Sequence, residues 1–476
     1  MRTLKNIILF VVIVAISFPV TSLACTTILV GKDLTADGAV LHGHNEDMGF
    51  TAVGRIVPMK EASYDKKDKL AVPYVTIPQS RKTYNYWGCG NALGATGLGT
   101  VQESRPYDWV LVGMNQWGVT MSCNWMYSKE ESLPEKGIRR YAIRQLILER
   151  CKTAREAVKL IAGFIDKYGQ ADWSGLDYCL ADPKEAWIVE TTTKNWVAKR
   201  VKDNEFIVIA NRFVIGEDYD MSSKDLIAYA VKMGWYDRKK DGKFSFKKVY
   251  GRPDRMNSPY DVDRENRASE LLEGKQGVMT PEDLFQVLMD RYEGTDKFRK
   301  PISDMEHWEA VTDKLGIPRP INTNLCQSST VAQLRSGLPV EMGSVMWYAM
   351  ATAGYSGYFP VYAGATIIPD EFQNVNSAYS PSSAWWTFRI LQKVADSKYD
   401  ELYPYLKAYW TGRHGSVVAR TGEIEARVKG LMAKGKKAEA VDLLNKFTYS
   451  QAKSALQEAR FQLSTVQRKT GNISIW

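Results

Sequence analysis

The chain has 476 residues, of which 45% are hydrophobic and 25% are charged, an ordinary globular composition with enough apolar residues for a large core. The formal net charge is +9, but Lys and Arg are spread along the chain. A nucleic-acid site needs clustered charge, so we expect no nucleic-acid partner. The one dense run, KGKK at 434–437, is expected to be a solvated turn between helices.

The first 24 residues have the three parts of a secretory signal peptide. Arg2 and Lys5 supply the positive start, a mostly apolar run without charge follows at 7–20, and small residues within 22–24 precede a cut before Cys25. The apolar run is short for a membrane span, although a retained anchor helix is the alternative. We predict a periplasmic or secreted protein with no stable membrane anchor after cleavage.

The stretch after the signal predicts a β-hairpin. Residues 27–31 and 38–43 are short apolar runs, and the polar segment 32–37 between them is typical of a turn. Further strands are expected at 55–58, 74–77, 109–114, 118–123, 178–180, 187–190, 196–201 and 206–209.

Helical patterns interrupt these strands. Residues 153–156 predict a capping box, and an apolar helical face follows and ends near Gly169. A second helix starts at 280–283, with Pro at its first position, and continues to Tyr292, while a shorter one is expected at 267–272. From 382 to about 469, Gly and Pro become sparse and helical periodicity predicts a helical layer. Strand runs with segregated helices favour an α+β architecture of stacked layers.

Thiols and imidazoles are few: Cys25, Cys89, Cys123, Cys151, Cys179 and Cys326, with His42, His44, His307 and His414. No C-x-x-C, H-E-x-x-H or other metal-ligand spacing occurs, so we expect no metal and no cofactor. Five cysteines remain beside Cys25, and buried free thiols are a better expectation for them than a dense disulfide scaffold.

Cleavage after Ala24 would give Cys25 both a thiol and a free α-amino group. A thiol with an ordinary pKa of about 8.5 is mostly protonated at pH 7 and needs a base. An α-amine titrates at about 7.7–8.0 and can accept that proton directly or through one water. One residue would then supply nucleophile and base.

Three alternatives compete for Cys25. Lipidation would produce an envelope-anchored binding protein with a blocked amine, but Ser22 stands where lipoprotein signals carry a branched aliphatic residue. A buried strand-edge cysteine with no chemical role is the second. Thr26 or Thr27 would be the nucleophile if the cut lay further on.

The segment 43–49, GHNEDMG, follows the second strand of the hairpin and is expected near Cys25. Glu46 and Asp47 could orient the amine and hold it positively charged after proton transfer, and His44 could add positive charge near the thiolate. A solvated loop that turns at Gly49 is the competing interpretation.

The segment 25–49, CTTILVGKDLTADGAVLHGHNEDMG, resembles the mature start of the dipeptidase A and secernin-like family of cysteine N-terminal-nucleophile (Ntn) hydrolases, which are related to choloylglycine hydrolases. The similarity continues in ANRFVIGE at 210–217, in VAQLRSGLPVEMGSVMW at 331–347 and in YAG at 362–364. The resemblance implies a four-layer αββα Ntn-hydrolase sandwich.

The resemblance also implies a domain division and a set of site residues. The signal occupies 1–24, the peptidase domain 25–380, and a helical C-terminal layer packed on it 381–476. Cys25 matches the nucleophile and Asp47 the acid that hydrogen-bonds the α-amine.

Further site residues follow from the same resemblance. His44 lies where the superfamily often has Arg or Lys, so the role stays basic but becomes pH-dependent. Asn124 resembles the oxyanion-hole asparagine, and Asn211 the second polar residue that faces the tetrahedral intermediate. Structural turn roles compete for both asparagines.

The arginine that supports the cysteine is assigned to Arg267, ahead of its helix. Arg255 and Arg264 compete for that role, and a surface helix charge is the structural alternative. The glycine-rich segment 88–99 lacks the spacing and leading strand of a dinucleotide site, and we expect a flexible loop there. Residues 472–474 fit a glycosylation sequon.

We predict a secreted cysteine dipeptidase in which Cys25 attacks the amide and water resolves the thioester. Dipeptides are the expected substrates, and His44 and Glu46 are the candidates for recognising a free substrate terminus. The alternative is an amidase of acyl or bile-acid-type amides on the same scaffold. The side-chain preference and the oligomeric state do not follow from the sequence.

Overall fold

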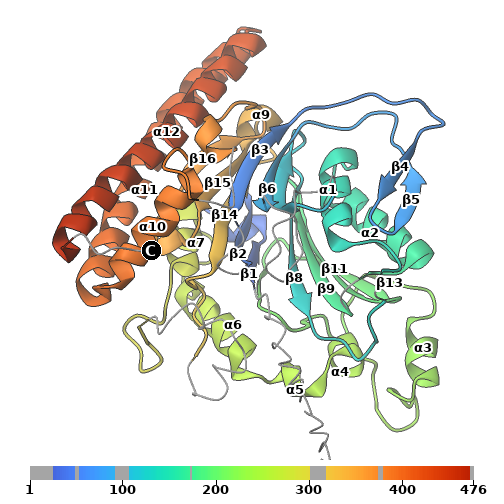
Figure 1. Cartoon of the computed structure of the whole chain (residues 1–476). Coiled ribbons are helices and arrows are strands. Elements are labelled where there is room, and N and C mark those ends of the chain that lie inside the picture. Colours follow the sequence, from blue (N-terminus) through green and yellow to red (C-terminus); the bar gives the residue numbers. More distant parts are fainter. Residues whose placement is uncertain are drawn as a thin grey trace, which may run out of the picture.

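The computed structural model describes residues 25–48, 53–91, 107–133, 135–171, 174–300, 318–373 and 379–471. The predicted signal peptide and sequon lie outside these ranges. Within them, two antiparallel sheets lie face to face and helices cover the outer face of each (Figure 1). The predicted four-layer αββα sandwich with a helical C-terminal extension is confirmed.

The first sheet has six strands in the order β12-β1-β2-β14-β15-β16. Their bounds are β1 Thr26–Val30, β2 Val40–Asp47, β12 Phe206–Ile209, β14 Cys326–Leu334, β15 Ser344–Met350 and β16 Phe359–Tyr362. β1 and β2 form the predicted hairpin, with Thr27 opposite His44. Every residue of both strands is buried, which explains the continuous run of β-branched and apolar residues in β1.

Strand β2 is longer than predicted. It continues through 43–47, the segment expected to follow the strand, so the interpretation of those residues as a solvated loop is wrong. The polar side chains of this segment are buried because the second sheet and helix α7 cover the faces of β2.

The second sheet has eight strands in the order β13-β11-β10-β9-β8-β7-β6-β3. Their bounds are β3 Gly54–Met59, β6 Tyr86–Asn91, β7 Val110–Asn115, β8 Thr120–Met126, β9 Gly175–Ala181, β10 Ala186–Thr192, β11 Trp196–Val201 and β13 Met221–Ser222. A separate hairpin is made by β4 Lys69–Val72 and β5 Val75–Pro78. All eight strands predicted between 55 and 209 are present. His42 joins the two sheets through contacts of 2.9 Å with Thr120 and Ser122.

Strand β6 corrects the prediction of a flexible glycine-rich loop. Gly88 and Gly90 lie in this buried strand, and residues 92–99 fall outside the described ranges. A Cβ on Gly88 would lie 2.7 Å from the Trp109 ring, and one on Gly90 would lie 1.9 Å from the Trp109 carbonyl oxygen. These glycines therefore allow close packing rather than flexibility.

Helices α1 Arg140–Arg150 and α2 Ala154–Tyr168 pack on the outer face of the eight-stranded sheet. The hydroxyl of Thr153 caps α2 by accepting a hydrogen bond from the Glu156 backbone N–H at 3.1 Å. The Glu156 carboxylate accepts a hydrogen bond from the backbone N–H of Lys152. The predicted capping box would use the N–H of the next residue, Thr153. The helix ends at Gly169, as predicted.

Helices α6 Pro259–Leu272 and α7 Pro281–Leu288 pack on the six-stranded sheet. The prediction that the first of these starts at 267 is wrong, because the helix begins at Pro259, which suits a first helical position. The capping box of Thr280 is present in α7. The helix ends before the predicted Tyr292, whose positive φ of 63° does not fit a helix.

Three long helices follow at the C-terminal end: α10 Ala384–Asp396, α11 Tyr399–Ala433 and α12 Lys437–Thr470. They are the orange and red helices of Figure 1, and α10 and α12 contact β15 and β16. The KGKK run is the predicted turn between α11 and α12. The domain boundary at 380 stays a prediction. Shorter helices are α3 Leu226–Lys232, α4 Phe246–Tyr250, α5 Pro253–Met256 and α9 Val340–Gly343.

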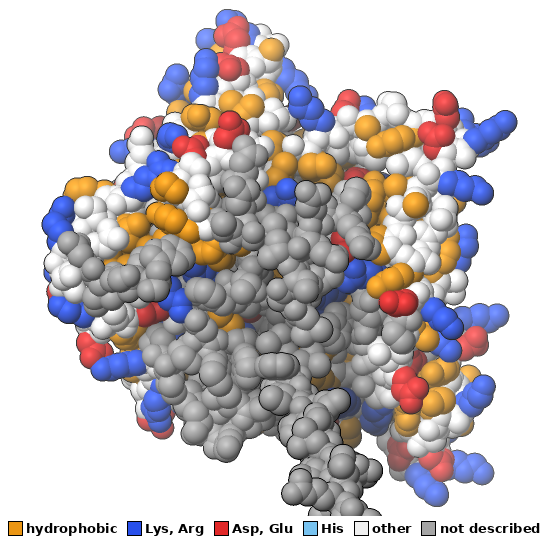
Figure 2. Space-filling view, viewed as in Figure 1, with side chains coloured by type: hydrophobic (Ala, Val, Ile, Leu, Met, Phe, Trp, Pro, Cys, Tyr) orange, Lys and Arg blue, Asp and Glu red, His pale blue; other side chains and the backbone are white. Residues whose placement is uncertain are grey.

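The surface agrees with the even distribution of charge along the chain. On the face shown in Figure 2, Lys and Arg side chains are scattered around the outline and interleaved with acidic ones. Among the helices of the described ranges, none combines the length and apolar character that a membrane span requires.

Candidate active site

Cys25 precedes the first residue of β1 and is 2% exposed. The antiparallel pairing of β1 with β2 brings the end of β2 beside it. The thiol lies 3.6 Å from the Glu46 carboxylate, to which it donates a hydrogen bond. The predicted neighbours His44, Glu46 and Asp47 are therefore gathered around Cys25, all of them buried.

A chain of hydrogen bonds fixes the proton on one nitrogen of His44. The amide nitrogen of Asn124 donates to the backbone carbonyls of 209–210, at 3.1 and 2.8 Å, so its oxygen is the acceptor for the Thr27 hydroxyl at 2.8 Å. The Thr27 oxygen must then accept from Nδ1 of His44 at 2.8 Å. Nε2 of His44 is left facing Oε2 of Glu46 at 3.2 Å.

The electrostatics hold Glu46 ionised and the thiol protonated. Burial pushes the pKa of Glu46 upward, but Arg144 and His44 outweigh it and the pKa lies below its ordinary value. Burial, followed by the charges of Glu46 and Asp47, raises the pKa of the Cys25 thiol well above its ordinary value. The Asp47 backbone N–H and Arg144 oppose this increase only in part. The thiol therefore needs a base before it can attack.

The arginine that contacts the cysteine is Arg264 rather than Arg267. Arg264 donates to the Cys25 carbonyl at 2.8 Å, to the Asn211 side-chain oxygen at 2.9 Å and to Asp261 at 2.8 Å. Arg267 pairs with Asp290 instead, at 3.0 and 2.9 Å. Helix α6 begins at Pro259, so it includes both arginines. Arg264 lies on the turn next to Cys25, and Arg267 lies further along the helix.

The remaining competitor, Arg255, pairs with Asp261 at 2.8 Å. It therefore contacts the same carboxylate as Arg264.

The Asp47 carboxylate is held by two residues that the sequence did not indicate. Arg319 donates to one oxygen at 2.6 Å and Thr323 to the other at 2.9 Å. These partners lie 272 and 276 positions away, just before β14, and no local motif marks them.

Asn124 and Asn211 differ in how many side-chain N–H groups are already used in hydrogen bonds within the protein. Both N–H groups of the Asn124 amide are used by backbone carbonyls. The Asn211 amide donates once, to the Trp125 carbonyl at 2.9 Å, so its second N–H has no partner in the described part of the chain. Asn211 therefore keeps one N–H group available, whereas Asn124 holds Thr27 in place.

Arg144 is a further charged residue that sequence reasoning missed. Its Nη1 lies 3.7 Å from Oε2 of Glu46, and its Nη2 donates to the Cys123 carbonyl at 2.9 Å. It comes from α1, a helix whose inward face is partly charged and which the apolar pattern did not reveal.

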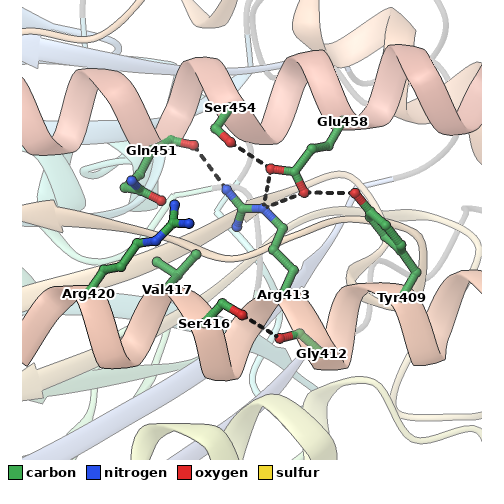
Figure 3. A pocket seen from close by; sticks show the side chains of 9 residues that line it. All are labelled: Tyr409, Gly412, Arg413, Ser416, Val417, Arg420, Gln451, Ser454 and Glu458. Carbon is green, nitrogen blue, oxygen red and sulfur yellow. Dashed lines mark hydrogen bonds and ion pairs between the residues drawn. The ribbon is translucent and has the colours of Figure 1, made fainter.

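A cavity is present between two of the C-terminal helices. It is an open groove of about 360 Å³ between α11 and α12, where Arg413 pairs with Glu458 (Figure 3). Its lining consists of Tyr409, Gly412, Arg413, Ser416, Val417, Arg420, Gln451, Ser454 and Glu458. It offers no thiol or imidazole, so we place the chemistry at Cys25. All six cysteines of the chain are free and buried, which confirms the expectation for them.

A buried thiol at the start of an inner strand of an αββα sandwich, with acids and a basic side chain around it, characterises a class of cysteine hydrolases. The model of peptidase family C69 matches residues 24–276 and 272–412. The chain belongs to peptidase family C69, and the predicted cysteine peptidase class is confirmed.

Several sequences named as probable dipeptidases are similar to this chain. A probable dipeptidase B of Streptococcus pyogenes is 26% identical over 416 residues, 79% of each chain. A probable dipeptidase A of the same species is 25% identical over 486 residues, 93% of this chain and all of the relative. A probable dipeptidase of Latilactobacillus sakei is 23% identical over 406 residues, 79% of this chain and 82% of the relative.

Two solved structures also align with the chain. A mutant conjugated bile acid hydrolase from Clostridium perfringens aligns over 71% of this chain and 92% of its own, with 12% identity and a TM-score of 0.37. Penicillin V acylase from Agrobacterium tumefaciens aligns over 71% and 86%, with 14% identity and a TM-score of 0.36.

Proposed function

We propose that the protein is a secreted or periplasmic dipeptidase whose nucleophile is Cys25, exposed as the N-terminal residue by signal cleavage after Ala24. The names of the similar proteins support dipeptides as substrates. The raised pKa of the thiol supports a base held close to it, and an α-amine on the same residue would be that base.

The proposed reaction is acyl transfer through a thioester. The α-amine of Cys25 takes the thiol proton, the sulfur attacks the peptide carbonyl, and the same amine returns the proton to the leaving amine. The free N–H of Asn211 supports a donor role toward the oxyanion, and Arg264 positions Asn211 and Cys25 relative to each other. Water then hydrolyses the thioester and regenerates the thiol.

The single observation that favours a dipeptide over an acyl amide is the Glu46 carboxylate 3.6 Å from the sulfur. In a dipeptide, the α-ammonium group is only two bonds from the carbonyl carbon that the sulfur attacks. A carboxylate beside the sulfur is therefore placed to bind that ammonium group. An N-acyl amide has no such charge and would gain no charge-assisted hydrogen bond from the carboxylate.

The test compares kcat/KM for a dipeptide and its N-acetylated form in wild type and Glu46→Gln. We expect the wild type to prefer the free amine and Glu46→Gln to lose about 10- to 100-fold on the dipeptide, since a charge-assisted hydrogen bond is worth about 1.5–3 kcal/mol. The acetylated substrate should change far less. Glu61→Gln makes the same chemical change at an exposed position and should leave both values unchanged.

Three outcomes would contradict the proposal. Preference of the wild type for acylated amines would favour the amidase alternative. Full hydrolysis by Cys25→Ser would exclude Cys25 as nucleophile. Mass spectrometry of the mature N-terminus should show an unmodified Cys25, and an acylated Cys25 or an intact Met1 would exclude the N-terminal mechanism.

A further inference from the structure

We propose that Cys25, His44 and Glu46 form an inhibitory binding site for a thiophilic divalent cation such as Zn²⁺. The sulfur of Cys25, a ring nitrogen of His44 and a carboxylate oxygen of Glu46 lie within 4.8 Å of one another, and all three side chains are buried. Thiolate, imidazole and carboxylate are the three donor types that proteins offer to zinc.

Two of the distances between these side chains are close to those of tetrahedral coordination. Zinc bonds of about 2.3 Å to sulfur and about 2.0–2.2 Å to nitrogen and oxygen place neighbouring donors roughly 3.3–3.6 Å apart. Nε2 of His44 lies 3.2 Å from Oε2 of Glu46, and the Cys25 sulfur lies 3.6 Å from Oε1. These distances involve different oxygens of Glu46, and the three donors, which lie within 4.8 Å of one another, would draw closer together around a bound ion.

The surroundings prepare His44 as a ligand. Its Nδ1 proton is held by the Thr27 oxygen, and Thr27 is held in turn by Asn124. A hydrogen bond of this kind on the second nitrogen fixes the tautomer and ring orientation of metal-binding histidines. The nitrogen left for a metal is then Nε2, which faces Glu46, and the ion would take the place of the proton between these two groups.

The fourth ligand follows from the proposed function, on which this step rests. A free α-amine on Cys25 would bind the same ion and close a five-membered ring with the thiolate. The ion would then occupy the nucleophile, the base and the carboxylate assigned to the substrate amine. The positive charge of Arg144, 3.7 Å from Glu46, repels the bound ion. This repulsion favours reversible inhibition over permanent binding of the ion.

The experiment titrates Co²⁺, a spectroscopic substitute for Zn²⁺, into the mature full-length protein under reducing conditions. We expect a thiolate-to-cobalt charge-transfer band and the visible bands of tetrahedral cobalt, at one ion per chain, both removed by Zn²⁺. Zn²⁺ should inhibit dipeptide hydrolysis and a chelator should restore it. His44→Gln should weaken cobalt binding at least about tenfold while Cys25 still reacts with iodoacetamide.

The matched control is His414→Gln, which removes a buried imidazole on α11 and should leave the cobalt spectrum unchanged. Absence of the charge-transfer band would overturn the site. Wild-type cobalt affinity in His44→Gln or in Glu46→Gln would also overturn it. Equal affinity in a chain that keeps one residue before Cys25 would overturn the amine ligand. The spectrum does not depend on turnover, so a protein that binds cobalt but hydrolyses no dipeptide would refute only the proposed function.

Discussion

His414 on α11 connects the C-terminal helices to the sheet region and allows a quantitative test of that packing. The ring is 2% exposed and lies against Phe285 and Tyr358, at centroid distances of 5.3 and 5.2 Å. Its Nε2 accepts a hydrogen bond from the Tyr358 backbone N–H at 3.1 Å. Burial, followed by the charge of Arg413, lowers the pKa of His414 to about 3.

This pKa makes the stability of the protein depend on pH in a defined direction. The unfolded chain takes up the proton at a pKa near 6.5, whereas the folded chain takes it up only near 3. The contribution is therefore complete above about pH 6.5 and is lost as the pH falls toward 3. Between pH 6 and pH 4, His414 alone should lower the free energy of unfolding by about 2.5 kcal/mol.

Urea unfolding at pH 6 and pH 4 measures this loss. In His414→Gln, the amide oxygen can still accept from the Tyr358 N–H but does not titrate, so the decrease between the two pH values should be smaller by about 2.5 kcal/mol. Any general destabilisation by the substitution cancels in that difference. Lys429→Gln, at an exposed position of the same helix, leaves His414 in place and should behave as wild type. A His414→Gln protein with the full wild-type decrease would refute the burial argument.

Three further predictions concern the site and its support. Glu46→Gln removes the nearest charge that raises the pKa of the Cys25 thiol, so the pH profile of iodoacetamide alkylation should shift down by about 1–3 units; an unchanged profile would contradict the assignment. Arg264→Gln leaves buried acceptors unpaired and should lower the free energy of unfolding by about 3–5 kcal/mol in urea, together with loss of activity. Gly90→Ala should sharply reduce the unfolding midpoint, whereas Gly412→Ala, in open space on α11, should be neutral or stabilising by up to about 1 kcal/mol.

The strands were largely predictable because their sequences carry the information locally. Runs such as 27–31 and 196–201 combine β-branched, apolar or aromatic residues between polar turns. Each forms a strand that pairs with the strand next to it in the chain, β1 with β2 and β11 with β10. Helix α1 was not predictable in this way. Its buried face includes Arg144, Gln145 and Glu149, so an apolar period of 3.6 residues does not appear in its sequence.

The residues of the site also differ in how far the local sequence predicts their positions. Cys25 and the acids of β2 come together through one hairpin, whose register follows from the alternation of a single strand pair. Arg264, Arg319 and Arg144 reach the site from elements far away in the chain, and only the three-dimensional arrangement decides which arginine meets which acid. The preference for Arg267 over Arg264 depended on a helix boundary, a feature that local sequence marks weakly.

The charge balance around Cys25 explains why a base on the same residue suits this site. Each buried acid near the sulfur has a cationic partner, in the pairs Glu46 with Arg144, Asp47 with Arg319, and Asp261 with Arg264. An uncompensated buried charge is strongly unfavourable. Transfer of the thiol proton to the α-amine, as proposed, creates one negative and one positive charge on the same residue and leaves the net charge of the cluster unchanged. Loss of the same proton to solvent would leave an unpaired thiolate beside Glu46 and Asp47, the arrangement that raises the thiol pKa.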